Sequence, residues 1–505
     1  MSAMLMQKNQ DGYATIFTIL LFAVMGLAAF SMFDSGQVAA ERVRLQNTSD
    51  AAAYSAASLL ARDYNFTAYT NRAMIANQAA IGQLVAINSW THYLEQEAIN
   101  LDTAGTIAQV VPGIGQAIKA VTNAVRMFAE RLSDVVVQVT GAGVGVLDEY
   151  IYFLSKAQQI YHEAAYFSSM EATLAIIKQN DSDVEFGLVQ TLAGLAKYSD
   201  RWQSSIRKNE VSLGQGRESD SVNRSRFREK TALVVASRDR FTADRATTWM
   251  NHRSFAARIQ MRKRGATEFD MDDSGDAITW DWTSLDTESL WIALPRISRF
   301  RIRYRWRETM PVGWGAAHAL DEGSDHNYFS RRQCAGNRCY NTSPGSKWGN
   351  AWENRWAATL GASNGRGNNL SKINGLRDYR DFETDRDPRF SGRAPAESSQ
   401  SPGVTVHLAK KSSNISTSQD QLQSGSGTAV AEQLNIDSSG SLPTDRIVSV
   451  ATAESYFSRP TSLWPRADRR LEHGNLYNPY WQPRLTEVSP GSRLIAAQLA
   501  TGSPL

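Results

Sequence analysis

The dominant apolar pattern in the chain is an uncharged run at residues 12–33, which lies between Asp11 and Asp34. Apart from Gly12 and the Tyr and Thr residues near its start, the run is almost wholly apolar. At about 1.5 Å rise per residue, a helix of this length covers the ~30 Å hydrocarbon core of a bilayer and pairs its own backbone amides. The pattern therefore predicts a transmembrane helix over residues 13–33, with residues 1–12 as a short cytoplasmic tip.

The run differs from a cleaved secretory signal. Few charges precede it, its apolar core exceeds the ~7–15 residues typical of a signal, and the helical pattern continues beyond it. Small residues around Ala39 and Ala40 leave cleavage open as the alternative. We expect an uncleaved anchor.

Residues 34–212 keep a helical pattern. Between positions 51 and 61 almost every residue is Ala or Ser, and such small residues let backbones approach closely. The face that carries Leu45, Ala52, Ala56 and Leu59 is therefore predicted to pack against another helix. Segments rich in Pro and Gly punctuate residues 65–212, so four or five helices are expected there, forming a bundle near the membrane.

The pattern becomes strand-like further along the chain, after a polar and charged segment at 213–230 that is expected to be a linker. Residues 299–307 alternate strictly, with arginines on one face and large apolar residues on the other. The arginine row consists of Arg299, Arg301, Arg303, Arg305 and Arg307.

An acidic row alternates in the same way upstream, at Glu268, Asp270 and Asp272. An antiparallel meander in which the two rows face each other is the simplest arrangement, although each exposed pair would add only about 0.2–1 kcal/mol. The alternative is a surface that binds an anion such as lipid A, a polysaccharide or a nucleic acid.

The remaining regions complete an α+β prediction: a long membrane helix that continues into a helical bundle, followed by an antiparallel distal region with long loops. A β-rich domain is expected over 231–360, a loop-rich and low-complexity region over 361–444, and a strand with a docking aromatic tail over 445–505. Trp348, Trp352 and Trp356 recur at every fourth position. This spacing is typical of one helical stripe in a core, with a sugar-stacking platform as the alternative.

The composition narrows the classes of partner and site that the chain can have. A net charge of +3 over 505 residues gives no overall field that would favour nucleic acid as a partner. The only cysteines, Cys334 and Cys339, lack the neighbouring ligands that zinc requires. In an oxidising compartment, a small-loop disulfide is their expected role.

No motif assembles a catalytic or metal site. Asp437, Ser439 and Ser441 match the metal-adhesion loop of von Willebrand A domains, which holds Mg²⁺ through oxygen ligands. The match lies in a Ser/Gly-rich tract without a preceding buried strand. His162 opens a zincin-like pattern whose second histidine is replaced by Tyr166. We therefore expect that the chain is not an enzyme and that it binds no metal or cofactor.

The membrane-proximal residues resemble the Tad (Flp) pilus-assembly proteins of the TadE/TadG type. The resemblance rests on the apolar run and on the sequence Leu-Gln-Asn-x-x-Asp-Ala-Ala-Ala at 45–53. It implies a single-pass protein of the bacterial inner membrane, with a periplasmic bulk, that assembles or anchors adhesive pili. The implied partners are the inner membrane and other pilus-assembly or pilin-like membrane helices, with self-association as a further option.

The chain departs from the family pattern in two respects. TadG-like members often carry a von Willebrand A domain, and none fits here. Pilin-like members are cut after a Gly and carry Glu at the fifth mature position, whereas a cut between Gly12 and Tyr13 would place Phe17 there. The alternative function is a surface adhesin or minor pilus component that binds polysaccharide through an arginine or tryptophan surface.

Overall fold

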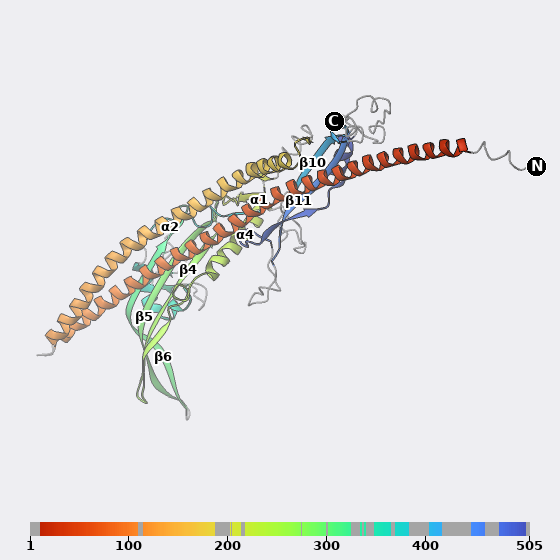
Figure 1. The fold of residues 1–505 in the computed structure, drawn as a ribbon. Helices are drawn as coiled ribbons and strands as arrows, with labels where there is room; N and C mark the ends of the chain where they lie inside the picture. The colour runs from red at the N-terminus through yellow and green to blue at the C-terminus, as the bar shows by residue number, and fades with distance from the viewer. Residues whose placement is uncertain are drawn as a thin grey trace, which may run out of the picture. The chain divides into compact units, whose positions relative to one another are not determined.

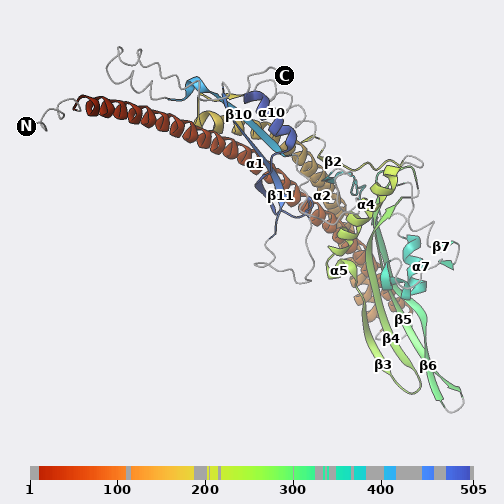
Figure 2. The same ribbon diagram turned by 90° about the vertical axis from the view of Figure 1, so that its right-hand side faces the viewer.

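The structure is a computed structural model, and the part of the chain that it describes consists of several segments. These are residues 11–109, 115–186, 202–203, 205–213, 218–273, 275–298, 301–324, 334–335, 338–339, 348–364, 369–382, 403–416, 446–459 and 474–500. Figure 1 and Figure 2 show the ribbon from two sides.

The chain forms two compact units, each assembled from segments that lie far apart in the sequence. Unit 1 comprises Met1–Phe66, Ile160–Ile206 and Asp385–Leu505, and unit 2 comprises Thr67–Gln159 and Arg207–Thr384. Each unit combines helix with antiparallel sheet, so the fold class is α+β, as predicted. The expected succession of a helical region and a β-rich domain does not describe these units, because both contain parts of the same two long helices.

Those helices are α1 (Asp11–Ala108) and α2 (Gly115–Asn180). No proline precedes Pro112, so the sequence offers α1 no strong breaker along its length. Where several shorter helices were expected, α1 and α2 run unbroken over residues 65–108 and 115–180, because glycines of α2 serve packing and do not end a helix. A Cβ at Gly143 would lie 2.9 Å from Leu84 Cδ1, and one at Gly141 would lie 3.1 Å from the carbonyl oxygen of Leu370.

The main sheet of unit 2 is an antiparallel meander in the order β3-β4-β5-β6. The strands are β3 (Thr247–Arg253), β4 (Arg258–Asp272), β5 (Thr279–Ser298) and β6 (Arg301–Ala319). One face packs against the 3-10 helix η1 (Gly349–Glu353) and helix α7 (Arg355–Asn364), with Leu285, Ala316 and Trp352 in the shared core.

The tryptophan spacing does not produce one helical stripe. Trp348 precedes η1, Trp352 lies within it, and their buried rings stack at a centroid distance of 5.8 Å. Trp356 belongs to α7 and is 54% exposed. The stripe is interrupted because a 3-10 turn precedes the α-helix and changes the rotation per residue.

The expected linker is also corrected, because most of residues 213–230 belongs to helix α4 (Glu218–Ala236). Phe227 of α4 is fully buried and packs edge-on against Trp280 at 4.9 Å. Arg226 is 1% exposed and donates to Asn209 Oδ1 at 2.8 Å. Buried contacts with the sheet therefore stabilise a helix whose own composition is polar.

Unit 1 contains a second antiparallel sheet, in the order β1-β10-β11-β12. Its strands are β1 (Glu185–Phe186), β10 (Val404–Lys411), β11 (Arg446–Phe457) and β12 (Trp481–Thr486), and helix α10 (Pro490–Ala500) follows. Strand β10 lies inside the region expected to be loop-rich. Its alternating apolar residues Val404, Val406 and Leu408 were the missed signal.

The aromatic C-terminal segment docks within unit 1. Trp481 is 3% exposed and lies 5.1 Å from the ring of Tyr64. The side chain of Asn65 of α1 forms two hydrogen bonds with the backbone of Trp481, donating to its carbonyl oxygen at 2.9 Å and accepting from its amide at 3.0 Å.

The smaller elements of the fold are β2 (Ile206–Lys208), α5 (Arg240–Ala243), β7 (Cys334–Ala335), β8 (Arg338–Cys339), β9 (Arg380–Phe382) and η4 (Ser412–Asn414).

A buried carboxyl in unit 2 leads to a pH prediction. Asp281 is 4% exposed and accepts hydrogen bonds from the amide of Asp321 and the hydroxyl of Ser324. Burial, followed by the charges of Asp321 and Asp270, raises the pKa of Asp281 from 3.8 to about 6. Because the folded state holds this proton more tightly, the free energy of unfolding should fall as the pH rises from about 4 through 6, by about 3 kcal/mol.

Replacement of Asp281 by Asn should remove most of this fall. Denaturant unfolding of wild type and variant at pH 4.5 and pH 7.5 measures the difference. The matched control is Asp276→Asn, at an exposed position, which should keep the wild-type slope. A slope that is equal in Asp281→Asn and wild type would contradict the assignment.

Candidate functional site

The N-terminal part of α1 presents an apolar surface to its surroundings. An 18-residue window near the start of this helix has a mean hydropathy of 2.4, and none of it is buried. Side chains such as Ile16, Phe22 and Met32 are 60%, 66% and 77% exposed. Within the described residues, α1 is the helix that is long and apolar enough to cross a membrane.

The next part of α1 is buried on one face, but mainly against a sheet. Leu45 and Ala52 are fully buried in a cluster with Ile177 of α2 and with Val406 and Leu408 of β10. The Leu45 carbonyl oxygen accepts a hydrogen bond from Ser449 of β11 at 3.1 Å. The face predicted to pack against a helix thus contacts α2 through Ile177 and, in addition, the unit 1 sheet, because small residues allow a close approach to either kind of element.

The other two predicted packing residues lie on the same stretch of α1. Ala56 is 1% exposed, whereas Leu59 is only partly buried. The stretch thus packs tightly along most of one face.

A buried lysine links this part of α1 to the sheet. Lys410 of β10 lies 2.9 Å from Glu41 of α1 and 3.0 Å from Asp181, which follows α2. Burial alone would lower the pKa of Lys410, but its bonds to the two carboxylates raise it above the ordinary value. Removal of one partner from such a group leaves a buried charge uncompensated, so the three residues fix the helix just beyond its apolar run.

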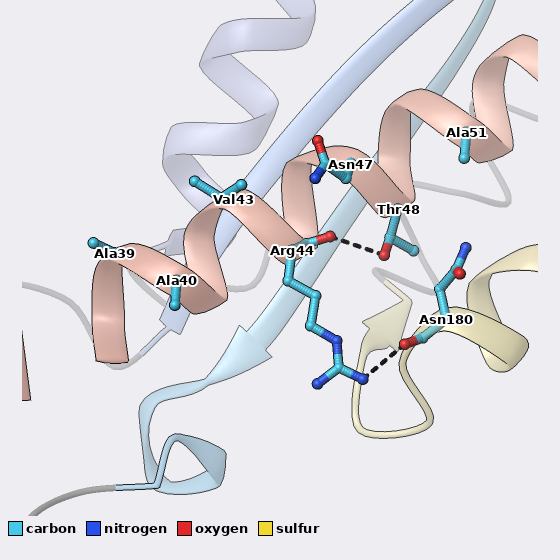
Figure 3. A pocket seen from close by; sticks show the side chains of 8 residues that line it. All are labelled: Ala39, Ala40, Val43, Arg44, Asn47, Thr48, Ala51 and Asn180. Carbon is cyan, nitrogen blue, oxygen red and sulfur yellow. Dashed lines mark hydrogen bonds between the residues drawn. The ribbon is translucent and has the colours of Figure 1, made fainter. Parts of the chain in front are cut away.

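A groove of about 750 Å³ lies on the opposite, exposed side of the same helix (Figure 3). Arg44 crosses the groove and donates to the carbonyl oxygen of Asn180 at 2.8 Å. Its wall repeats every fourth residue of α1, which is the spacing of one helix face. The lining residues are Ala39, Ala40, Val43, Arg44, Asn47, Thr48, Ala51 and Asn180.

This groove suits the close approach of another helix. Most of its wall is Ala, Val and Thr, which let backbones come together, and Asn47 offers hydrogen bonds. Among the described residues, its lining contains no acid, histidine or cysteine.

The comparison with protein families identifies this segment. Residues 12–59 match the model of the family described as putative Flp pilus-assembly TadE/G-like. The N-terminal segment of this chain is TadE/G-like. The comparisons with curated proteins and with solved structures found no match. The TadE/G-like segment contains the exposed apolar window, the buried Leu45 face and the groove wall on α1.

The other predicted site residues lie elsewhere or outside the described part. Gly12 and Tyr13 are in the first turn of α1. Cys334 and Cys339 are direct partners in the antiparallel pair β7–β8, a backbone spacing that suits a disulfide. The loop with Asp437, Ser439 and Ser441 lies outside the described residues. Within the described residues, no group of three or more His, Cys, Asp or Glu side chains could hold a metal ion.

The arginine row does not face the acidic row. Strand β5 separates β4 from β6, so Asp270 lies opposite Asp281, whereas Arg305 lies opposite Leu294. Arg303, Arg305 and Arg307 are exposed on β6, Arg301 begins the strand, and Arg299 lies outside the described residues. The predicted ion pairing is wrong because it assumed direct pairing of two strands that the sheet order keeps apart.

A buried histidine cluster in unit 1 was not predicted. His162 Nδ1 lies 2.7 Å from Asp63, its Nε2 lies 3.0 Å from the carbonyl oxygen of Trp202, and its ring stacks on that indole at 4.4 Å. The residues are up to 139 positions apart (202 − 63) and share no local motif. Only the folded structure brings Asp63 of α1, His162 of α2 and Trp202 together.

Proposed function

We propose that this chain is a non-catalytic, membrane-anchored structural protein of a Tad (Flp)-type pilus-assembly system. One observation carries the proposal: the TadE/G-like segment is a single helix, exposed and apolar in its first part and buried against the unit 1 sheet in its next part. Such a helix would connect a bilayer to a folded body directly, without a flexible linker between them.

In this proposal the apolar run lies in the bacterial inner membrane, the short N-terminal tip is cytoplasmic and the bulk is periplasmic. The groove at Ala39, Val43, Asn47 and Ala51 receives a helix of another pilus-assembly or pilin-like protein, or of a second copy. An oxidising periplasm also suits the opposed Cys334 and Cys339. The alternative, an adhesin or minor pilus component, differs in predicting protein in sheared surface filaments.

Arginines in the apolar run provide the test. Leu20→Arg combined with Val24→Arg should release the protein from the membrane fraction, because each arginine near the centre of a spanning helix costs about 2.5–3.5 kcal/mol. A C-terminal tag follows the full-length protein through inner membrane, soluble and sheared surface fractions, and mass spectrometry records its length.

The matched control exchanges the same positions conservatively, as Leu20→Val with Val24→Leu, and should stay in the inner membrane at full length. Retention of the double-arginine variant in carbonate-washed membranes would contradict the anchoring role. Wild type that is soluble and shortened would mean a cleaved signal, and wild type in the sheared fraction would favour the alternative.

A further inference from the structure

Unit 2 contains a second concave site, a cleft of about 1150 Å³. It lies on the side of the sheet covered by η1 and α7, and Figure 2 shows α7 beside this sheet. It is formed wholly by residues of unit 2 and is separate from the TadE/G-like segment. Its lining combines arginines, tryptophans, carboxylates and an amide. These residues are Ala243, Asp244, Arg262, Ala266, Trp291, Arg305, Trp306, Arg307, Glu308, Asn350, Trp352, Glu353 and Arg355.

Arg262 of β4 is held in place by aromatic rings. Its guanidinium carbon lies 4.3 Å from the ring centre of Trp291 and 5.2 Å from that of Trp306, and its Nε donates to Gln260 at 3.0 Å. Contacts of this kind orient a cation without neutralising it. Within the described part of the chain, no carboxylate pairs with Arg262 at ion-pair distance. Burial, and next the charge of Arg264, lowers the pKa of Arg262.

The carboxylates of the cleft are already engaged within unit 2. Glu353 pairs with Arg264 at 2.8 Å, and Asp244 accepts from Asn350 at 2.8 Å. Glu308 accepts from the backbone amides at the start of α7, at 2.9 Å and 3.2 Å. Their presence in the lining therefore does not neutralise Arg262.

Three further arginines border the cleft. Arg355 opens α7, and Arg305 and Arg307 lie on β6, the edge strand of the sheet. All three are exposed and form no ion pair among the described residues. Because alternate residues of a strand point to opposite faces, Trp306 shares the face of Arg262 while Arg305 and Arg307 project to the other side. Of the three, Arg355 at the start of α7 therefore adds positive charge on the side of the cleft.

We propose that this cleft binds an acidic polysaccharide, with a sugar carboxylate on the guanidinium of Arg262. A planar guanidinium matches a carboxylate in a bidentate manner, and partly exposed indoles offer apolar area beside it. The bordering carboxylates and Asn350 can exchange hydrogen bonds with sugar hydroxyls. Sugar hydroxyls can donate hydrogen bonds to these carboxylates, whereas the phosphates of a nucleic acid only accept them, so the lining favours a polysaccharide over a nucleic acid. This binding activity goes beyond the anchoring function and does not depend on it.

A hexamer of galacturonate tests the inference, because each of its rings carries one carboxylate. Titration of the detergent-solubilised full chain by calorimetry should detect binding of this hexamer, with little or no binding of neutral maltohexaose or of a thymidine oligonucleotide. Arg262→Gln should weaken binding at least about tenfold, the effect of losing a charged hydrogen bond. The second variant, Arg355→Gln, changes an exposed residue that the fold does not require and should weaken binding at least about threefold.

The matched control is Arg303→Gln, an exposed arginine of β6 that does not line the cleft, and it should bind as wild type does. Three results would overturn the proposal: no binding of the hexamer by wild type, equal binding by wild type and both cleft variants, or equally tight binding of the oligonucleotide.

Discussion

Replacing Asp286 with alanine is expected to destabilise unit 2 by about 3–5 kcal/mol, because the change leaves two buried cations uncompensated. Asp286 lies on β5 and is fully buried. Arg245 forms a bidentate pair with it, at 2.9 Å to each oxygen, and Lys263 bonds to the same carboxylate. Ser89 of α1 donates to it at 2.8 Å.

The pH dependence of this group runs opposite to that of Asp281. Burial alone would raise the pKa of Asp286, but the charges of Arg245 and Lys263 hold it below the ordinary value. The folded state thus favours the carboxylate, so its contribution is complete above about pH 4 and is lost as the pH falls further. The free energy of unfolding of Asp286→Asn should be lower than that of wild type at neutral pH and close to that of wild type in strong acid.

Denaturant unfolding of the full chain, followed by tryptophan fluorescence, measures both effects. The matched control is Asp273→Ala, which removes ion pairs to the exposed Arg224 and Arg228 and should cost no more than about 1 kcal/mol. If Asp286→Ala destabilises the protein no more than Asp273→Ala does, the buried network contributes little to stability.

Gly315→Ala is expected to destabilise unit 2 by about 3 kcal/mol through overpacking. Gly315 of β6 lies directly against the backbone of α1, where a Cβ would overlap the carbonyl oxygen of Ser89 and the amide nitrogen of Tyr93. Backbone atoms cannot rotate away as a flexible side chain can. The helix would have to move off the sheet, and the hydrogen bond from Ser89 to Asp286 would stretch.

Thermal and denaturant unfolding of the Gly315→Ala chain measure this cost. The control is Gly145→Ala in α2, where the nearest heavy atom is Ser371 Oγ at 3.6 Å, an ordinary contact. That change should be neutral or stabilising, because alanine favours a helix over glycine by about 1 kcal/mol. If Gly315→Ala and Gly145→Ala have the same free energy of unfolding, α1 does not approach β6 as closely as described here.

Local patterns determined the features that need no distant partner. The apolar run near the N-terminus predicts a spanning helix from its own length and composition, and α1 contains it. The strict alternation after Arg301 predicts an extended strand, and β6 begins there. The Leu45–Ala53 motif lies within the TadE/G-like segment and is a signal of the sequence alone. Each of these signals depends on neighbours a few residues apart.

Only the tertiary structure decided what each surface packs against. Ser89 and Asp286 are 197 residues apart, yet they share a buried network. The small-residue face of α1 could have received a helix as well as the sheet of Val406 and Leu408 that covers it. The order of β4, β5 and β6 separated the arginine and acidic rows. Alternation and apolar periodicity fix which face of an element is buried, whereas the partner depends on shape and charge complementarity between segments far apart in the chain.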